Sequence, residues 1–232
     1  MKISYILGAL ILTAIAASSA TANTENTPEN PEITVNVETP VSPRENYKYI
    51  ASLSYSAADF PIPGKFGVTG GLVTSPQQTW ELEYMRGTFS VPGGFRDLGS
   101  ITDSRLSLIG RTYFGGSFHV SYGLSYFNFN AQVGDQLMNT ATGGVYPAMN
   151  AADVQGLGAN IGVGNTWVFR KDITVGVDWL AWAQPLYTLK RSSDYLNYET
   201  DEQSRRSVED TLKIMSYVPR FAMVNVHVGM LF

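Results

Sequence analysis

The sequence predicts an all-β fold, an eight-stranded antiparallel up-and-down transmembrane β-barrel. Segments in which every second side chain is apolar recur eight times from Tyr47 onward, as expected for strands with one face toward lipid. The last segment runs to the carboxyl-terminal residue, Phe232. After residues 1–22 no long apolar run follows. A membrane protein without spanning helices must be a closed barrel, because only closure pairs every backbone amide in hydrocarbon. A secreted β-sandwich, which shares the alternation, is the alternative fold.

Residues 1–22 have the organisation of a secretory signal peptide. Lys2 precedes an apolar run from Ile6 to Ala17, and the small residues that follow predict cleavage after Ala22. The run is too short to span a bilayer comfortably, which disfavours an uncleaved anchor.

Residues 23–46 form an acidic, Pro-containing segment, which we expect to be an extended periplasmic tail. The barrel is then residues 47–232. The chain has no Cys, so disulfides, a lipid-anchored amino terminus and thiolate metal sites are excluded, and no cofactor or metal is expected. The net charge of −4 gives no indication of nucleic-acid binding.

The first two strands are expected on either side of a connection at 59–65 that contains two prolines. In the first strand the odd positions from Tyr49 to Ala57 face lipid, and in the second Phe66, Val68, Gly70 and Leu72 do so.

The third and fourth strands carry opposite charges on their inward faces. Glu81 and Glu83 alternate with outward Trp80, Leu82 and Tyr84, while Arg105 and Arg111 point inward from 105–114. Because these strands are antiparallel neighbours, the carboxylates should lie level with Arg111. A buried charge without a partner costs several kcal/mol, on the order of the desolvation penalty, so we expect an interior cluster.

The fifth strand, 118–126, follows a glycine turn at 115–117 and points His119 inward. The sixth strand covers 157–169. The seventh, from Ile173 to Trp182, has alternate residues outward and is predicted to place five residues inside: Thr174, Gly176, Asp178, Leu180 and Trp182. Asp178 is expected to meet Asn225 or His227 of the eighth strand.

In the eighth strand the even positions from Ala222 to Phe232 form a wholly apolar face, with Asn225 and His227 opposite. A terminal aromatic residue on such a strand resembles the signal that outer-membrane β-barrels present to their assembly machinery. Phe232 is therefore expected to be an assembly signal.

Connection lengths predict the orientation of the barrel. Short connections are expected at 76–78, 115–117 and 170–172, and the others at 59–65, 91–103, 130–156 and 185–220. Outer-membrane barrels keep short turns in the periplasm, so both termini are expected there. Within the last connection, 204–215 is predicted to form a helix with Val208, Leu212 and Met215 on one face.

The segment from Tyr47 to Phe232 resembles the small outer-membrane β-barrel superfamily, which includes the OmpA transmembrane domain and OmpX-like proteins. The resemblance rests on the signal peptide, the eight strands, the early strand Trp80–Tyr84 and Phe232. It does not identify a subfamily. It implies a place in the bacterial outer membrane, lipid and lipopolysaccharide as neighbours, contact with the barrel-assembly machinery through the last strand, and a monomer.

Eight strands leave an interior only just wide enough to be filled by side chains. The inward charged and histidine residues are therefore predicted to form a structural lumen cluster rather than a proton path or a hydrolytic site: Glu81, Glu83, Arg105, Arg111, His119, Asp178 and His227.

His119 and Ser121 resemble the His-x-Ser pair of outer-membrane lipid A deacylases. However, the pair lies beside a predicted periplasmic turn and points inward, and 122–134 contains no acid. We therefore expect a non-enzymatic barrel whose loops at 130–156 and 185–220 mediate adhesion, surface interaction or envelope integrity through a surface ligand. A lipid A-modifying enzyme and a narrow channel are the alternatives.

Overall fold

The structure is a computed structural model that describes residues 44–92, 97–114, 116–134, 149–169, 172–197 and 201–232. These residues belong to one compact unit, Pro40–Phe232. The signal peptide and residues 23–43 of the predicted tail lie outside the described residues and remain predictions.

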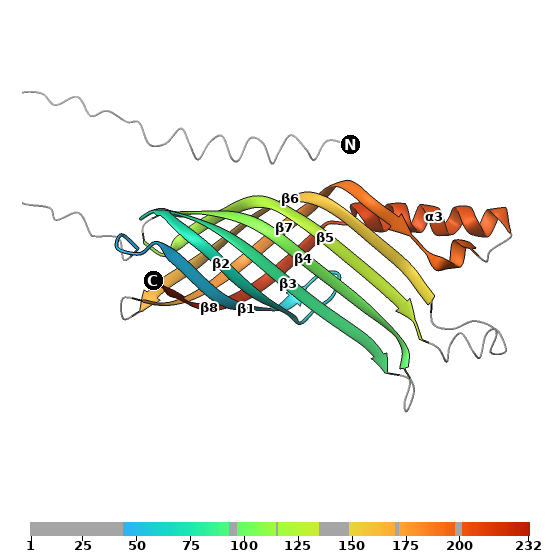
Figure 1. The fold of residues 1–232 in the computed structure, drawn as a ribbon, viewed down its shortest axis with the longest axis horizontal. Coiled ribbons are helices and arrows are strands. Elements are labelled where there is room, and N and C mark those ends of the chain that lie inside the picture. The colour runs from blue at the N-terminus through green and yellow to red at the C-terminus, as the bar shows by residue number, and fades with distance from the viewer. Residues whose placement is uncertain (1–43, 93–96, 115, 135–148, 170–171, 198–200) are drawn as a thin grey trace, which may run out of the picture. The chain divides into compact units, whose positions relative to one another are not determined.

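Eight antiparallel strands form a closed barrel in sequence order, and β1 pairs with β8 to complete the ring (Figure 1). The predicted fold class is confirmed. The strands are β1 (Tyr49–Asp59), β2 (Lys65–Ser75), β3 (Gln78–Pro92), β4 (Asp97–Phe114), β5 (Phe118–Val133), β6 (Met149–Phe169), β7 (Ile173–Ser192) and β8 (Arg220–Leu231). No helix in the described part of the chain is long and apolar enough to cross a membrane.

Side chains alternate between the interior and the exterior of the barrel as the sequence predicts. In β1, Leu53 is 68% exposed whereas Ser54 is 5% exposed. Apolar residues thus lie outside and polar residues inside, the reverse of a water-soluble barrel, because the exterior of such a barrel faces hydrocarbon.

The wall of the barrel differs in height around the ring. Strands β1, β2 and β8 have 11, 11 and 12 residues, whereas β4, β6 and β7 have 18, 21 and 20. About 9–11 residues suffice to span a membrane, so the longer strands extend beyond it. We call the end with the short β2–β3, β4–β5 and β6–β7 connections the turn end, and the opposite end, where β3 to β7 reach past β1, β2 and β8, the loop end (Figure 1).

Three predicted connections prove too long, because parts of them are strand. β4 begins at Asp97, β6 begins at Met149, and β7 continues to Ser192. The alternation of apolar and polar residues fades in these parts, where the exterior no longer meets lipid.

A row of irregular residues crosses three neighbouring strands at one level. Asn225 pairs with Ser56 and Asp178, and Met223 pairs with Ala58 and Leu180. Val224 therefore lies opposite Ala57 on one side and Trp179 on the other. Val224 has a φ of 59°, in the left-handed region that β-branched residues rarely adopt.

These irregularities reverse which face of each strand points inward toward the loop end. Leu180 and Trp182 were predicted to point inward but are 46% and 42% exposed, and Ala222 was predicted to face lipid but is 1% exposed. Those three predictions are wrong. Met223, predicted to point inward, is likewise exposed.

Helix α3 (Glu202–Tyr217) confirms the helix predicted within 204–215 and follows the short 3-10 helix η2 (Asp194–Asn197). Asp201 caps it by accepting a hydrogen bond from the Ser204 amide at 2.8 Å. Leu212 packs against Phe129 of β5 and Val154 of β6, together with a set of partly buried apolar residues that includes Val208 and Met215. The apolar face of α3 therefore covers the inner face of the extended wall.

Candidate functional site

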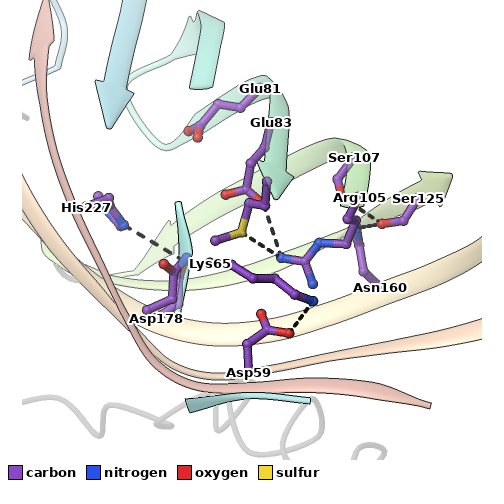
Figure 2. A network of polar contacts seen from close by, with 12 residues as sticks. Asp59, Lys65, Glu81, Glu83, Arg105, Ser107, Ser125, Asn160, Asp178 and His227 are labelled. Atoms are coloured by element: carbon purple, nitrogen blue, oxygen red, sulfur yellow. Dashed lines mark hydrogen bonds and ion pairs between the residues drawn. The ribbon is translucent and has the colours of Figure 1, made fainter. Parts of the chain in front are cut away.

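The structure places the seven side chains of the predicted lumen cluster inside the barrel. Each is at most 6% exposed: Glu81, Glu83, Arg105, Arg111, His119, Asp178 and His227. They come from β3, β4, β5, β7 and β8, and Figure 2 shows several of them converging on the lumen.

Asp178 is the residue with the most partners in this cluster. Its carboxylate accepts hydrogen bonds from Arg111 Nη2 at 3.2 Å and Asn225 Nδ2 at 3.3 Å, and it lies 2.9 Å from His119 Nε2. Arg111 also pairs with Glu81. The cluster thus joins β3, β4, β5, β7 and β8 through the interior.

The remaining members extend the cluster in two directions. His227 Nδ1 lies 3.9 Å from Asp178, and His227 Nε2 lies 3.1 Å from the Thr166 hydroxyl. Arg105 pairs with Glu83 at 3.3 Å and also contacts Met85 Sδ at 3.1 Å. Figure 2 shows His227 directed toward Asp178, and Arg105 beside Glu83 of the neighbouring strand.

A second buried cluster toward the loop end was not predicted. Lys65 pairs with Asp59 at 2.6 Å and with Asp103, and Arg220 Nε donates to Asp103 at 3.2 Å. The Arg220 guanidinium lies 4.5 Å from the centre of the Phe127 ring.

Sequence reasoning missed this second cluster because all four residues were assigned to connections: Asp59 and Lys65 to 59–65, Asp103 to 91–103, and Arg220 to 185–220. Asp59 and Arg220 also lie beyond the irregular residues that reverse the facing of β1 and β8. One signal was available, because continuing the alternation of β4 back from Arg105 places Asp103 on the inward face.

These side chains leave little space between them at this level of the lumen. A cavity bordered by Glu83, Arg105, Arg111, Asp178 and Asn225 measures about 20 Å³. A buried water requires roughly 10–15 Å³ on this scale, so the cavity holds about one water.

Arg44 lies in the mouth of the barrel at the turn end. It is 1% exposed and donates to the carbonyl oxygens of Gly116 at 3.0 Å and Thr166 at 2.9 Å. Its guanidinium lies 3.6 Å from the centre of the Tyr113 ring, a cation–π contact. Arg44 belongs to the predicted 23–46 tail, so the end of that segment is part of the barrel.

The exterior of β3 to β6 changes character between two adjacent rows of paired residues. The lower row is Tyr84, Leu106, Tyr126 and Leu157, and the next row toward the loop end is Arg86, Ser104, Asn128 and Gln155. Apolar and aromatic side chains give way to polar ones within one step along each strand. A change of this kind is expected at the edge of the lipid-facing band of a membrane barrel.

The polar rows line a groove of about 520 Å³ on the outer surface. Its residues all have outward-facing positions: Tyr84, Arg86, Thr88, Ser100, Thr102, Ser104, Asn128, Asn130, Gln132, Asp153 and Gln155. Part of this surface falls within the predicted binding segment 130–156, but strands carry it rather than a loop.

The His119–Ser121 pair lies inside the barrel, where His119 is fully buried against Asp178 and within 3.4 Å of the Thr166 hydroxyl. Within the described ranges no group of three or more His, Asp or Glu residues has a geometry that could hold a metal ion.

This architecture is similar to that of solved outer-membrane proteins. A major outer membrane protein from Thermus thermophilus superposes with a TM-score of 0.52 at 11% identity, over 81% of this chain and 100% of that chain. The chain has the fold of a small outer-membrane β-barrel. The predicted resemblance is thus confirmed at the level of the fold.

Two further small barrels are similar at lower TM-scores. Neisserial surface protein A gives 0.43 at 10% identity, over 79% of this chain and 96% of that chain. The N-terminal β-barrel domain of Pseudomonas aeruginosa OprF gives 0.40 at 15% identity, over 80% and 98%. No family model and no curated protein matches the sequence.

Proposed function

We propose that this small barrel is a non-enzymatic protein of the bacterial outer membrane that presents its loop end at the cell surface, for adhesion, surface interaction or envelope integrity. The observation that carries the proposal is the change from apolar to polar side chains on the exterior of β3 to β6. A wall that continues for several residues beyond the lipid boundary forms a surface exposed to water and to partners.

The lengths of the connections support an orientation with the turn end in the periplasm, as in other bacterial barrels. Arg44 and Phe232 both lie at the turn end, since Phe232 pairs with Tyr49 at the start of β1. Both termini are then periplasmic. In this orientation β8 and Phe232 are available to the assembly machinery, with Phe232 acting as the signal.

The buried lumen clusters act as the core of the barrel in this proposal. Arg105 and Arg111 are paired with Glu83 and Glu81 of the neighbouring strand, Arg111 also reaches Asp178 across the interior, and the cavity beside them measures about 20 Å³. This arrangement supports a plugged lumen over the alternative of a narrow channel.

Helix α3 offers a second exposed surface at the loop end. Its apolar residues face the inner wall, which leaves a set of charged residues exposed: Arg205, Arg206, Glu209, Asp210 and Lys213. Within the predicted 185–220 segment, 185–192 belongs to β7, and the proposal takes α3 as the part that meets a surface ligand.

Cysteine labelling tests the proposed orientation, because the chain has no natural Cys. Arg206→Cys on α3 and Gln77→Cys in the β2–β3 turn are both exposed positions. A membrane-impermeant maleimide should label the first variant in intact cells and the second only after the outer membrane is permeabilised. Labelling of the turn variant in intact cells would overturn the orientation.

Two measurements on a deletion strain and the purified protein address the alternatives. Unchanged lipid A mass spectra after deletion of the gene would exclude the alternative of a lipid A-modifying enzyme. Absence of conductance in planar bilayers would exclude the alternative of a narrow channel. Replacing the five charged α3 residues by Ser should abolish a cell-binding or envelope-stress phenotype if α3 meets the partner, and leave it intact if it does not.

A further inference from the structure

The polar groove on the exterior of β3 to β6 has the features of a ligand site. Its volume of about 520 Å³ lies within the range of roughly 300–1,000 Å³ found for small-molecule sites. Such sites are usually apolar, whereas nearly every residue of this groove is polar. We propose that the groove binds the saccharide headgroup of a glycolipid in the membrane leaflet around the loop end. The inference rests on the proposed function, which places this end of the barrel at the cell surface.

The functional groups in the groove match the hydroxyl groups of a sugar. Asn128, Asn130 and Gln155 carry amides, which both donate and accept hydrogen bonds, and Thr88 and Thr102 add hydroxyl groups. A sugar presents the same combination of donors and acceptors. Neighbouring strands lie about 4.8 Å apart, so these groups form a regular array along which a sugar ring can contact several strands at once.

Charges in the groove favour a neutral or anionic ligand. Asp153 pairs with Lys190 at 2.5 Å and accepts from Gln155 at 3.4 Å, so its charge is already compensated. No carboxylate in the described part of the chain pairs with exposed Arg86. Arg86 is thus available to a phosphate or carboxylate substituent on the sugar.

The position of the groove favours a ligand that is anchored in the membrane. The row that borders the groove on the membrane side contains Tyr84, Leu106, Tyr126 and Leu157. Acyl chains packed against Leu106 and Leu157 would bring a headgroup level with Arg86 and Asn128. Tyr126 donates to Gln155 at 3.0 Å across this boundary, which orients the Gln155 amide at the groove floor.

Binding of fluorescently labelled lipopolysaccharide to the purified, detergent-solubilised full chain tests the proposal. Two groove variants are Arg86→Gln and the double variant Asn128→Ala with Asn130→Ala. A third, Thr102→Trp, fills the groove and leaves the other contacts in place. The matched control is Lys48→Gln combined with Gln77→Ala, both exposed at the turn end and away from the groove and α3. A shift in gel migration on heating confirms that each variant is folded.

The double variant loses several hydrogen bonds, and each is worth about 1 kcal/mol, so we expect binding to weaken about tenfold or more. Thr102→Trp should weaken it similarly and the control should equal the wild type. Binding of all groove variants within twofold of the wild type would overturn the proposal.

The source of the ligand is tested with two competitors. The proposal expects the oligosaccharide released from the same lipopolysaccharide to compete weakly, because it lacks acyl chains, and phosphatidylglycerol to compete weakly, because it lacks a sugar of that size. If either compound competed as strongly as intact lipopolysaccharide, the groove proposal would be overturned. A stable dimer in detergent that Arg86→Gln dissociates would overturn it as well, since a second copy would then occupy the groove. The labelling experiment with Arg206→Cys is unaffected by these results, so the proposed function can stand if the groove proposal fails.

Discussion

His119 of β5 and Asp178 of β7 meet at 2.9 Å across the interior, although β6 separates their strands in the sheet. Arg111 of β4 reaches the same carboxylate from three strands away. Backbone pairing holds each strand only to its two neighbours, so these contacts add cross-links of a different kind. They tie opposite parts of the ring together.

Replacing Asp178 by Asn should destabilise the barrel strongly. The change leaves Arg111 and His119 without a charged partner at this point, and breaking a buried ion pair costs about 3–5 kcal/mol. Unfolding by guanidinium in detergent measures the loss. The matched control is Glu202→Gln, which removes an exposed pair with Arg206 on α3 and should leave the midpoint unchanged. If the Asp178 variant unfolded at the same guanidinium concentration as the wild type, the cluster would not be a structural core.

Arg44→Ala should loosen the mouth at the turn end. The variant loses a cation–π contact with Tyr113 and two hydrogen bonds to backbone carbonyls, about 2 kcal/mol in total. Hydrogen exchange should then speed up at the neighbouring backbone around Gly116 and Thr166. Glu45→Ala, at the next and exposed position, serves as control. Unchanged exchange in the Arg44 variant contradicts the expectation.

Val224→Gly should be tolerated better than the same change at Val226. Val224 has a φ of 59°, which costs a non-glycine residue about 1–3 kcal/mol, and glycine relieves that cost. Val226 occupies a regular, similarly exposed position, where glycine should cost about 0.5–1 kcal/mol. Unfolding free energies of the two variants provide the comparison. A less stable Val224 variant would be the contrary result.

Phe232→Ala should reduce the amount of folded barrel in cells more than it reduces stability in vitro. The backbone of Phe232 still pairs with Tyr49, and only a ring stacked on Tyr49 at 5.8 Å is lost. Tyr49→Ala removes the same stacking contact without altering the terminal residue, and should assemble more efficiently. Heat-modifiable migration of both variants in cell envelopes measures folding. Equal assembly would exclude Phe232 as a signal.

Acidification should loosen the first turn of α3. The hydrogen bonds that Asp201 accepts from the backbone amide and the side chain of Ser204 lower the pKa of Asp201 below its usual value of 3.8. A lowered pKa means that the folded form favours the carboxylate. The cap therefore stabilises α3 at pH values above the usual pKa, and this stabilisation is lost as the pH falls through the lowered pKa. The protection of the Ser204 amide, measured as its exchange rate relative to that of an unstructured peptide at the same pH, should therefore be constant near neutral pH and decrease in acid. Asp201→Ala should show low protection of this amide at every pH.

Much of the fold follows from the sequence, because lipid on one face imposes a strict alternation. Leu53 and Ser54 follow that rule, as do Glu81 and Leu82, so the strand phase and the inward position of Glu81 could be predicted. The face of α3 was predictable for a similar reason, since Val208, Leu212 and Met215 recur at helical spacing.

The remaining features depend on interactions that alternation does not encode. Ala222, Met223 and Val224 are all apolar, so nothing in the sequence marks the reversal at Val224, where Met223 and Val224 are both exposed. Beyond the lipid boundary the contrast between faces disappears, as at Thr102 and Asp103, so strand ends were missed. Arg44 precedes the first strand, and only the closed ring brings Tyr113 within reach.

The uneven height of the wall determines how many residue pairs close the ring between β8 and β1. The last strand meets the first on the low side, through the nine residue pairs from Ile50 with Leu231 to Asp59 with Ala222, whereas β4 and β5 share sixteen. The junction between the two chain ends is therefore held by far fewer backbone hydrogen bonds than the high side. A partly folded sheet can complete itself by a short final pairing, and if the finished cylinder separates along its length, it should separate on the low side, at β1.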